Sequence, residues 1–134
     1  MSQFKRRTFQ TPSLEISYLE WDQGDEPLLL LHGMADLALV WSSLGDALAG
    51  KYHIIAPDLR GHGESSKPAT GYSCEDIIDD LEGLMASLGW ESAHIIGHSW
   101  GAKVAALWAN NNPCLLYTSP SPRDLSTSRM PSSA

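Results

Sequence analysis

Ser99 stands at the centre of a five-residue segment whose residue types suit nucleophilic catalysis. Gly97 and Gly101 flank it in the order G-x-S-x-G. An apolar run precedes this segment and an alanine-rich run follows it, so we expect the serine at a sharp corner between a strand and a helix. Amide groups at the start of such a helix would stabilise an oxyanion above the serine. The alternative interpretation is an ordinary strand–turn–helix corner without a chemical role.

Two further polar loops follow apolar runs of the kind that form buried strands. The run 28–31 consists of four leucines and ends at His32 and Gly33, and a second apolar run is followed by a polar loop over 58–65. Short, wholly apolar runs are typical of parallel strands that are buried on both faces. Because the carboxyl ends of parallel strands meet at one edge of a sheet, we expect both loops to lie close to Ser99.

These three segments together resemble the α/β-hydrolase superfamily, in its group of serine esterases, lipases, haloperoxidases and C–C hydrolases. The resemblance covers about residues 14–113 and rests on His32-Gly33, on the loop 58–65 and on the segment 97–101. It implies an α/β fold that corresponds to the N-terminal half of the family's domain. A mostly parallel sheet flanked by helices would follow an antiparallel β-hairpin.

The resemblance also implies a role for each residue that matches the family's motifs. Ser99 matches the nucleophile that forms an acyl-enzyme, and the backbone N–H groups of Met34 and Trp100 match the oxyanion hole. His32 matches the residue that holds the oxyanion loop in shape, with direct catalysis as the alternative. The supporting positions are His32, Gly33, Gly97, His98, Gly101, Asp58 and Arg60.

Several of these positions have a structural interpretation as well. Asp58 and Arg60 are expected to tie their loop together through buried hydrogen bonds or an ion pair, with substrate contact as the alternative. His98 is expected to pack or to form a hydrogen bond, because adjacent side chains diverge at such a corner. The segment 61–63, Gly-His-Gly, is expected to shape the backbone.

The reaction that this resemblance implies is hydrolysis of a small-molecule ester, amide, thioester or C–C bond by the parent protein, without a cofactor or a metal. The alternative is a ligand-binding or receptor member of the same fold. In this family an aspartate nucleophile implies haloalkane or epoxide chemistry, so Ser99 argues against both. The family's acid and histidine follow the serine, yet no histidine follows His98 and Asp124 is the only acidic residue after Ser99. We therefore expect the chain by itself to be inactive.

Residues 114–134 differ from the rest of the sequence. They are rich in serine and proline and have no apolar periodicity. The parts 114–124 and 128–134 resemble the translation of the two ends of a transposon-type sequencing-library adapter. We therefore expect residues 1–113 to be half of a hydrolase domain and residues 114–134 to be a non-native, disordered tail. The alternative is a genuine Ser/Pro-rich tail.

Hydrophobic periodicity and local stop signals predict the elements that position the candidate site. Strands are expected near 4–10, 14–21, 27–31, 53–57 and 92–96, and helices near 41–49, 74–88 and 100–111. Ser73 and Asp76 are expected to cap the helix 74–88, and Gly89 is expected to end it. The apolar residues Trp41, Leu44 and Leu48 are expected to face the core.

Charge and composition exclude several classes of partner. The net charge of −7 argues against a nucleic-acid surface, and the cluster 5–7, Lys-Arg-Arg, is expected to be solvated. No apolar run approaches the ~20 residues that span a bilayer, so we expect a cytoplasmic protein with a small-molecule substrate and without a membrane partner. Cys74 is the only cysteine outside the tail, which leaves no internal disulfide.

Overall fold

The structure, a computed structural model, describes residues 3–111, 116–118 and 125–128. Its strands are β1 (Lys5–Gln10), β2 (Glu15–Trp21), β3 (Glu26–Leu31), β4 (Tyr52–Pro57), β5 (Ala93–His98), β6 (Leu116–Thr118) and β7 (Leu125–Ser128). Its helices are the 3₁₀ helix η1 (Ala38–Trp41) and the α-helices α1 (Ser42–Leu48), α2 (Cys74–Leu88) and α3 (Trp100–Asn111).

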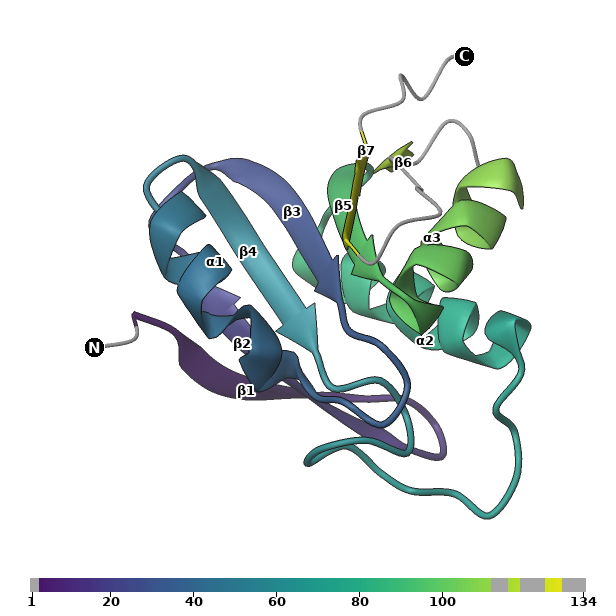
Figure 1. The fold of residues 1–134 in the computed structure, drawn as a ribbon. Helices are drawn as coiled ribbons and strands as arrows, with labels where there is room; N and C mark the ends of the chain where they lie inside the picture. Colours follow the sequence, from purple (N-terminus) through teal and green to yellow (C-terminus); the bar gives the residue numbers. More distant parts are fainter. Residues whose placement is uncertain (1–2, 112–115, 119–124, 129–134) are drawn as a thin grey trace.

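All described strands belong to one sheet, with the order β1-β2-β4-β3-β5-β6 and with β7 also paired to β5. Strand β3 pairs in parallel with β4 on one side and with β5 on the other. The hairpin β1-β2 is antiparallel and joins the sheet through an antiparallel pairing of β2 with β4. Helix α1 covers one face of the sheet, and α2 and α3 cover the other (Figure 1). The predicted fold class and the predicted order of elements are confirmed.

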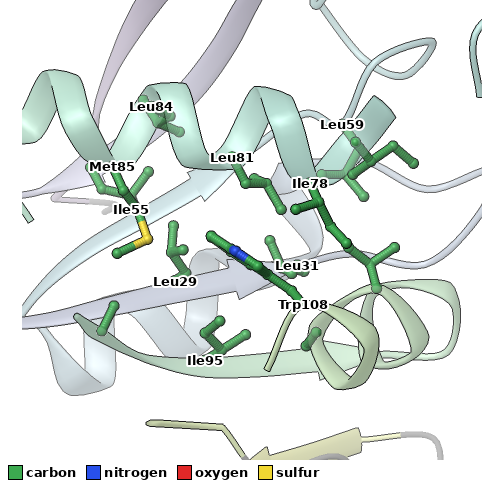
Figure 2. Packing of buried hydrophobic residues seen from close by; sticks show 14 of the residues in the cluster. Leu29, Leu31, Ile55, Leu59, Ile78, Leu81, Leu84, Met85, Ile95 and Trp108 are labelled. Carbon is green, nitrogen blue, oxygen red and sulfur yellow. The ribbon is translucent and has the colours of Figure 1, made fainter. Parts of the chain in front are cut away.

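The parallel strands are buried on both faces because their apolar side chains alternate between two cores. Leu29 and Leu31 of β3 belong to the cluster formed with α2 and α3, whereas Leu28 and Leu30 belong to the cluster formed with η1 and α1. Figure 2 shows the first cluster, in which Trp108 of α3 lies among side chains of the sheet and of α2. This double burial is what a run of consecutive leucines predicts.

The predicted caps of α2 are present. The side chain of Ser73 accepts a hydrogen bond from the N–H of Asp76 at 3.1 Å, and the carboxylate of Asp76 accepts one from the N–H of Ser73 at 3.2 Å. Gly89 ends the helix in the left-handed conformation, with φ of 74°. These signals are local in sequence, so the helix bounds match the prediction.

The helix that was predicted near 41–49 begins earlier and is divided into η1 and α1. The N–H of Ala38 donates a hydrogen bond of 2.7 Å to the carboxylate of Asp58, which pins the first turn from a distant loop. Trp41 is buried, and Leu44 and Leu48 pack against the same cluster, so the expected inward face is confirmed.

The outer edge of β5 is paired by segments from residues 114–134. Strand β6 pairs in parallel with the start of β5, and β7 pairs antiparallel with its end. In these two described segments the chain is extended, whereas the expectation for residues 114–134 was a non-native, disordered tail. An unpaired strand edge offers free N–H and C=O groups, which an extended segment can pair with whatever its side chains are. Residues 112–115, 119–124 and 129–134 lie outside the described residues.

Within the described ranges, no helix has the length and apolar character needed to cross a bilayer.

Candidate active site

Ser99 lies at the corner between β5 and α3 with a backbone φ of +56°. A residue with a side chain rarely adopts this conformation, which costs about 1–3 kcal/mol and persists only where the surroundings enforce it. The carbonyl oxygen of Ser99 accepts hydrogen bonds from the N–H groups of Ala102 and Lys103 at 3.0 and 3.2 Å. Ser99 therefore directly precedes α3, and it is exposed at the amino end of that helix.

Close backbone approach explains the two glycines of the corner. A Cβ atom on Gly97 would lie 2.7 Å from the N and Cα atoms of Ala102. A Cβ atom on Gly101 would lie 2.7 Å from the carbonyl carbon of Leu31 and 2.8 Å from the carbonyl oxygen of His32. All four distances are too short for a real Cβ atom, so α3 reaches β3 and β5 only because these positions lack side chains.

The loop that follows β3 lies directly against the serine. A Cβ atom on Gly33 would be 3.3 Å from the Cβ atom of Ser99. The loop turns because the N–H of Asp36 donates to the carbonyl oxygen of Gly33 at 3.2 Å, with Ala35 at a φ of +62°. The structure thus brings the predicted His-Gly loop and the predicted corner together.

The two amides that were expected to form an oxyanion hole lie on these adjacent segments. Among the described residues, the N–H groups of Met34 and Trp100 have no hydrogen-bond partner. The side chain of Met34 is 64% exposed, and the ring of Trp100 is partly buried with the Nζ atom of Lys103 5.3 Å from its centroid. Both amides therefore keep an unused hydrogen-bond donor.

His32 is fully buried and holds this loop through both ring nitrogens. Its Nδ1 atom is 2.7 Å from the carbonyl oxygen of Gly33, and its Nε2 atom accepts the N–H of Leu59 at 3.0 Å. A carbonyl only accepts and an N–H only donates, so the ring is neutral with its proton on Nδ1. Burial lowers the pKa of His32, which also favours the neutral form. Neither nitrogen is free for a substrate, and this favours the loop-holding role over direct catalysis.

Asp58 connects three segments of the chain. Its carboxylate is 1% exposed and accepts hydrogen bonds from the N–H of Ala38 at 2.7 Å, the N–H of Glu64 at 3.0 Å and the guanidinium of Arg6 at 3.1 Å. Gly63, at a φ of +52°, lies so close that a Cβ atom there would overlap the carboxylate. These contacts are structural and leave the carboxylate away from solvent.

The expectation that the basic cluster 5–7 is solvated is wrong for Arg6 and only partly right for Arg7. Arg6 pairs with the buried Asp58, and Arg7 donates to the buried Glu20 at 2.6 Å. A sequence shows only that the three basic residues are adjacent, whereas alternate residues of a strand face opposite sides and meet different partners.

Arg60 pairs with α2 and not with Asp58. Its guanidinium donates to both carboxylate oxygens of Asp80 at 2.7 and 2.8 Å and to the carbonyl oxygen of Gly71 at 2.6 Å. The side chain of Arg60 is 13% exposed. The ion pair therefore ties the loop after β4 to α2, a partner that the sequence pattern did not indicate.

His98 forms no hydrogen bond with the serine hydroxyl in the described part of the chain. The Nδ1 atom of His98 is buried without a hydrogen-bond partner among the described residues, and a Cβ atom on Gly33 would lie 3.4 Å from it. Within the described part of the chain, no side chain forms a hydrogen bond with the hydroxyl of Ser99. The described residues thus bring a serine and two amides together, and none of their side chains is hydrogen-bonded to the hydroxyl as a base would be.

Two other features lie apart from this site. A cavity of about 290 Å³ is lined by Glu82, Met85, Ala86, Trp90 and Trp108, and none of these belongs to the loops around Ser99. Across the described residues, no group of three or more His, Cys, Asp or Glu side chains is placed to hold a metal ion.

A serine at a strained strand-to-helix corner, facing a His-Gly loop from the neighbouring parallel strand, defines the nucleophile-elbow class of α/β proteins. The family described as alpha/beta hydrolase fold matches residues 26–117. The chain belongs to this family.

Its relatives include several kinds of hydrolase. It is 42% identical over 86 residues to a soluble epoxide hydrolase of Corynebacterium sp. (strain C12). The aligned segment covers 64% of this chain and 30% of that protein. It is 38% identical over 96 residues to 2-(acetamidomethylene)succinate hydrolase of Mesorhizobium japonicum, covering 71% of this chain and 34% of that protein. The chain thus spans about a third of the length of the curated relatives it matches.

The fold is also that of solved hydrolases. A bacterial membrane phospholipase A superposes with a TM-score of 0.81 at 32% identity, over 87% of this chain and 38% of that one. The relatives show a family of hydrolases and differ in the bond that their names imply.

Proposed function

We propose that the parent protein is a serine hydrolase that cleaves an ester, amide, thioester or C–C bond of a small molecule through an acyl-enzyme. The observation that carries this proposal is the exposed Ser99 at a φ of +56°, beside the two unpartnered amides of Met34 and Trp100. Strain of this kind persists where a position is functionally constrained.

The chemistry follows from these groups. The Oγ atom of Ser99 attacks a carbonyl carbon, its proton passes to a base, and the carbonyl oxygen becomes an oxyanion that the amides of Met34 and Trp100 bind. The bond to the leaving group then breaks, the leaving group takes up the proton, and water hydrolyses the acyl-serine. Each amide donor contributes about 3–4 kcal/mol to lowering the barrier in comparable sites.

A serine at this position disfavours epoxide or haloalkane opening, although relatives include an epoxide hydrolase. Attack of a serine oxygen on a saturated carbon would form an ether, which has no carbonyl for water to attack. Turnover would stop at that stage. A carboxylate nucleophile would instead form an ester, which water can hydrolyse at its carbonyl carbon.

The base and the orienting acid of this mechanism lie, in our proposal, in the part of the parent protein that follows residue 113. Sequencing the source DNA across this position tests the proposal together with the non-native origin of residues 114–134. A reading frame that continues into apolar strands, an acidic residue and a late histidine supports both. A genomic sequence that encodes residues 114–134 overturns both for this chain.

The activity test uses the complete protein expressed from that recovered gene. A fluorophosphonate probe should label the protein, and p-nitrophenyl esters should be hydrolysed. Ser99→Ala should abolish both, whereas Ser13→Ala, an exposed serine of the β1–β2 turn, should retain both. Unchanged hydrolysis by Ser99→Ala contradicts the proposal. Tight binding of small esters without labelling or turnover would instead favour the non-catalytic, ligand-binding alternative.

A further inference from the structure

We propose that His62 is a positioning residue for the oxyanion loop, acting through the backbone N–H of Ala35. The inference rests on the proposed function, because it concerns the amide of Met34. His62 was expected only to contribute to the backbone shape of the segment 61–63, and the structure gives its ring a specific contact. The N–H of Ala35 donates to the Nε2 atom of His62 at 3.1 Å.

The contact involves a residue whose backbone conformation is uncommon for a residue with a side chain. Ala35 has a φ of +62°, in the left-handed region that side chains disfavour. The conformation places its N–H toward the loop after β4, where His62 accepts it. Without an acceptor, the turn from Gly33 to Asp36 would depend on the single hydrogen bond of 3.2 Å between these two residues.

The other ring nitrogen sets the tautomer that this contact needs. The Nδ1 atom of His62 is 3.0 Å from the carbonyl oxygen of Arg60. A carbonyl oxygen only accepts, so Nδ1 bears the proton and Nε2 presents its lone pair to Ala35. The ring is thus a bridge that donates at one end and accepts at the other.

His32 makes the same kind of bridge beside it. The two rings are edge to face, with centroids 4.9 Å apart and planes at 61°. His32 joins Gly33 to Leu59, and His62 joins Ala35 to Arg60. The residues on both sides of Met34 are therefore anchored to one loop, and the amide of Met34 lies between the two anchors.

The anchored loop is the one that contacts the nucleophile, since Gly33 lies against the Cβ atom of Ser99. An amide that binds an oxyanion must be held in place before the charge forms, because preorganisation is the source of its effect. A shift of the loop would weaken this binding in the transition state more than it would weaken binding of the substrate. We therefore expect the effect in kcat rather than in KM.

The test compares His62→Phe with His62→Gln in the complete protein. Phenylalanine keeps an aromatic ring beside His32 but has no acceptor, whereas glutamine places an amide oxygen near the position of Nε2. With a p-nitrophenyl ester, His62→Phe should lower kcat about ten- to hundredfold with KM nearly unchanged. His62→Gln should recover most of this loss. His53→Phe is the matched control, because His53 lies at the amino end of β4, where it contacts Glu20, and it should leave kcat unchanged.

A second readout does not depend on activity. Hydrogen exchange of the Ala35 amide should be slow in the wild type and in His62→Gln and fast in His62→Phe. If the wild-type protein neither hydrolyses esters nor reacts with the probe, the proposed function fails, while this readout still decides the role of His62. Retention of kcat and of amide protection in His62→Phe, or equal losses in both variants, overturns the inference.

Discussion

Replacement of Asp58 by asparagine should test whether the site loops depend on a buried carboxylate. The side chain is 1% exposed, and its two oxygens accept from three donors. If the asparagine oxygen keeps the N–H of Ala38 at 2.7 Å, the new NH₂ group must face the N–H of Glu64 and the guanidinium of Arg6. Donors would then face donors at two contacts.

The size of the effect follows from these contacts. Loss of the hydrogen bond from the Glu64 N–H should cost about 1 kcal/mol, and loss of the bond from the charged Arg6 guanidinium should cost about 1.5–3 kcal/mol. The buried NH₂ group of the asparagine, left without an acceptor, should add about 1–3 kcal/mol. The side chain of Arg6 is 27% exposed and regains part of its hydration, which reduces the total. We expect the free energy of unfolding to fall by about 3–4 kcal/mol, within the range for breaking a buried ion pair. A typical domain has only about 5–15 kcal/mol of stability, so the loss should be large.

Urea unfolding of the complete protein, followed by tryptophan fluorescence, measures this difference. Asp22→Asn is the matched control, since Asp22 is 42% exposed and pairs with Lys5 at 3.8 Å on the surface. That pair should contribute at most about 1 kcal/mol. A loss below about 1 kcal/mol for Asp58→Asn, or a loss equal to that of Asp22→Asn, would refute the reasoning.

Two further substitutions probe the corner and the buried histidine. Gly101→Ala should force α3 away from β3, because its Cβ atom would lie 2.8 Å from the carbonyl oxygen of His32, and should lower stability by about 3 kcal/mol together with activity. Gly50→Ala is its control, with no atom within 4 Å, and a similar loss there would contradict this explanation. The lowered pKa of His32 means that the unfolded chain binds the proton more readily. Stability should therefore fall as the pH drops below about 6.5, by at most about 1.4 kcal/mol per pH unit, and His32→Gln should remove this part of the slope in urea midpoints measured at pH 7 and 5.5. An unchanged slope in His32→Gln would contradict it.

Elements with local signals were predictable from the sequence. The helix α2 runs over Cys74–Leu88 as expected, because its caps Ser73, Asp76 and Gly89 lie within three residues of its ends. The predicted strands agree with β1 to β5 to within two residues at either end. For β3 and β4 the signal was the uninterrupted apolar run that burial on both faces requires. The place of Ser99 at a strand-to-helix corner was equally predictable, because the flanking glycines are part of the same short segment.

Contacts between distant segments were not predictable in the same way. The sequence indicated that Asp58 and Arg60 are structural but did not indicate that their partners are Arg6 and Asp80. Each partner is 20 or more residues away, and many charged residues could meet either of them. The bridge from His62 to Ala35 was missed for a further reason. It depends on a positive φ at an alanine, which no residue-type rule predicts.

The contacts that hold the candidate site lie within the described residues, whereas the base of the proposed mechanism is proposed to lie elsewhere in the parent protein. Ser99, the loop at Gly33 and the loop at Asp58 are held by backbone bonds, glycine contacts and buried ion pairs that all lie within residues 3–111. The base that the proposed mechanism needs is supplied by none of the described residues. Arg6 of the amino-terminal hairpin is part of this framework, because its guanidinium reaches the carboxylate that also holds Ala38. A change in β1, far from Ser99 in sequence, should therefore disturb the surroundings of Ser99. A base that follows residue 113, as we propose, would not require these contacts to be rebuilt.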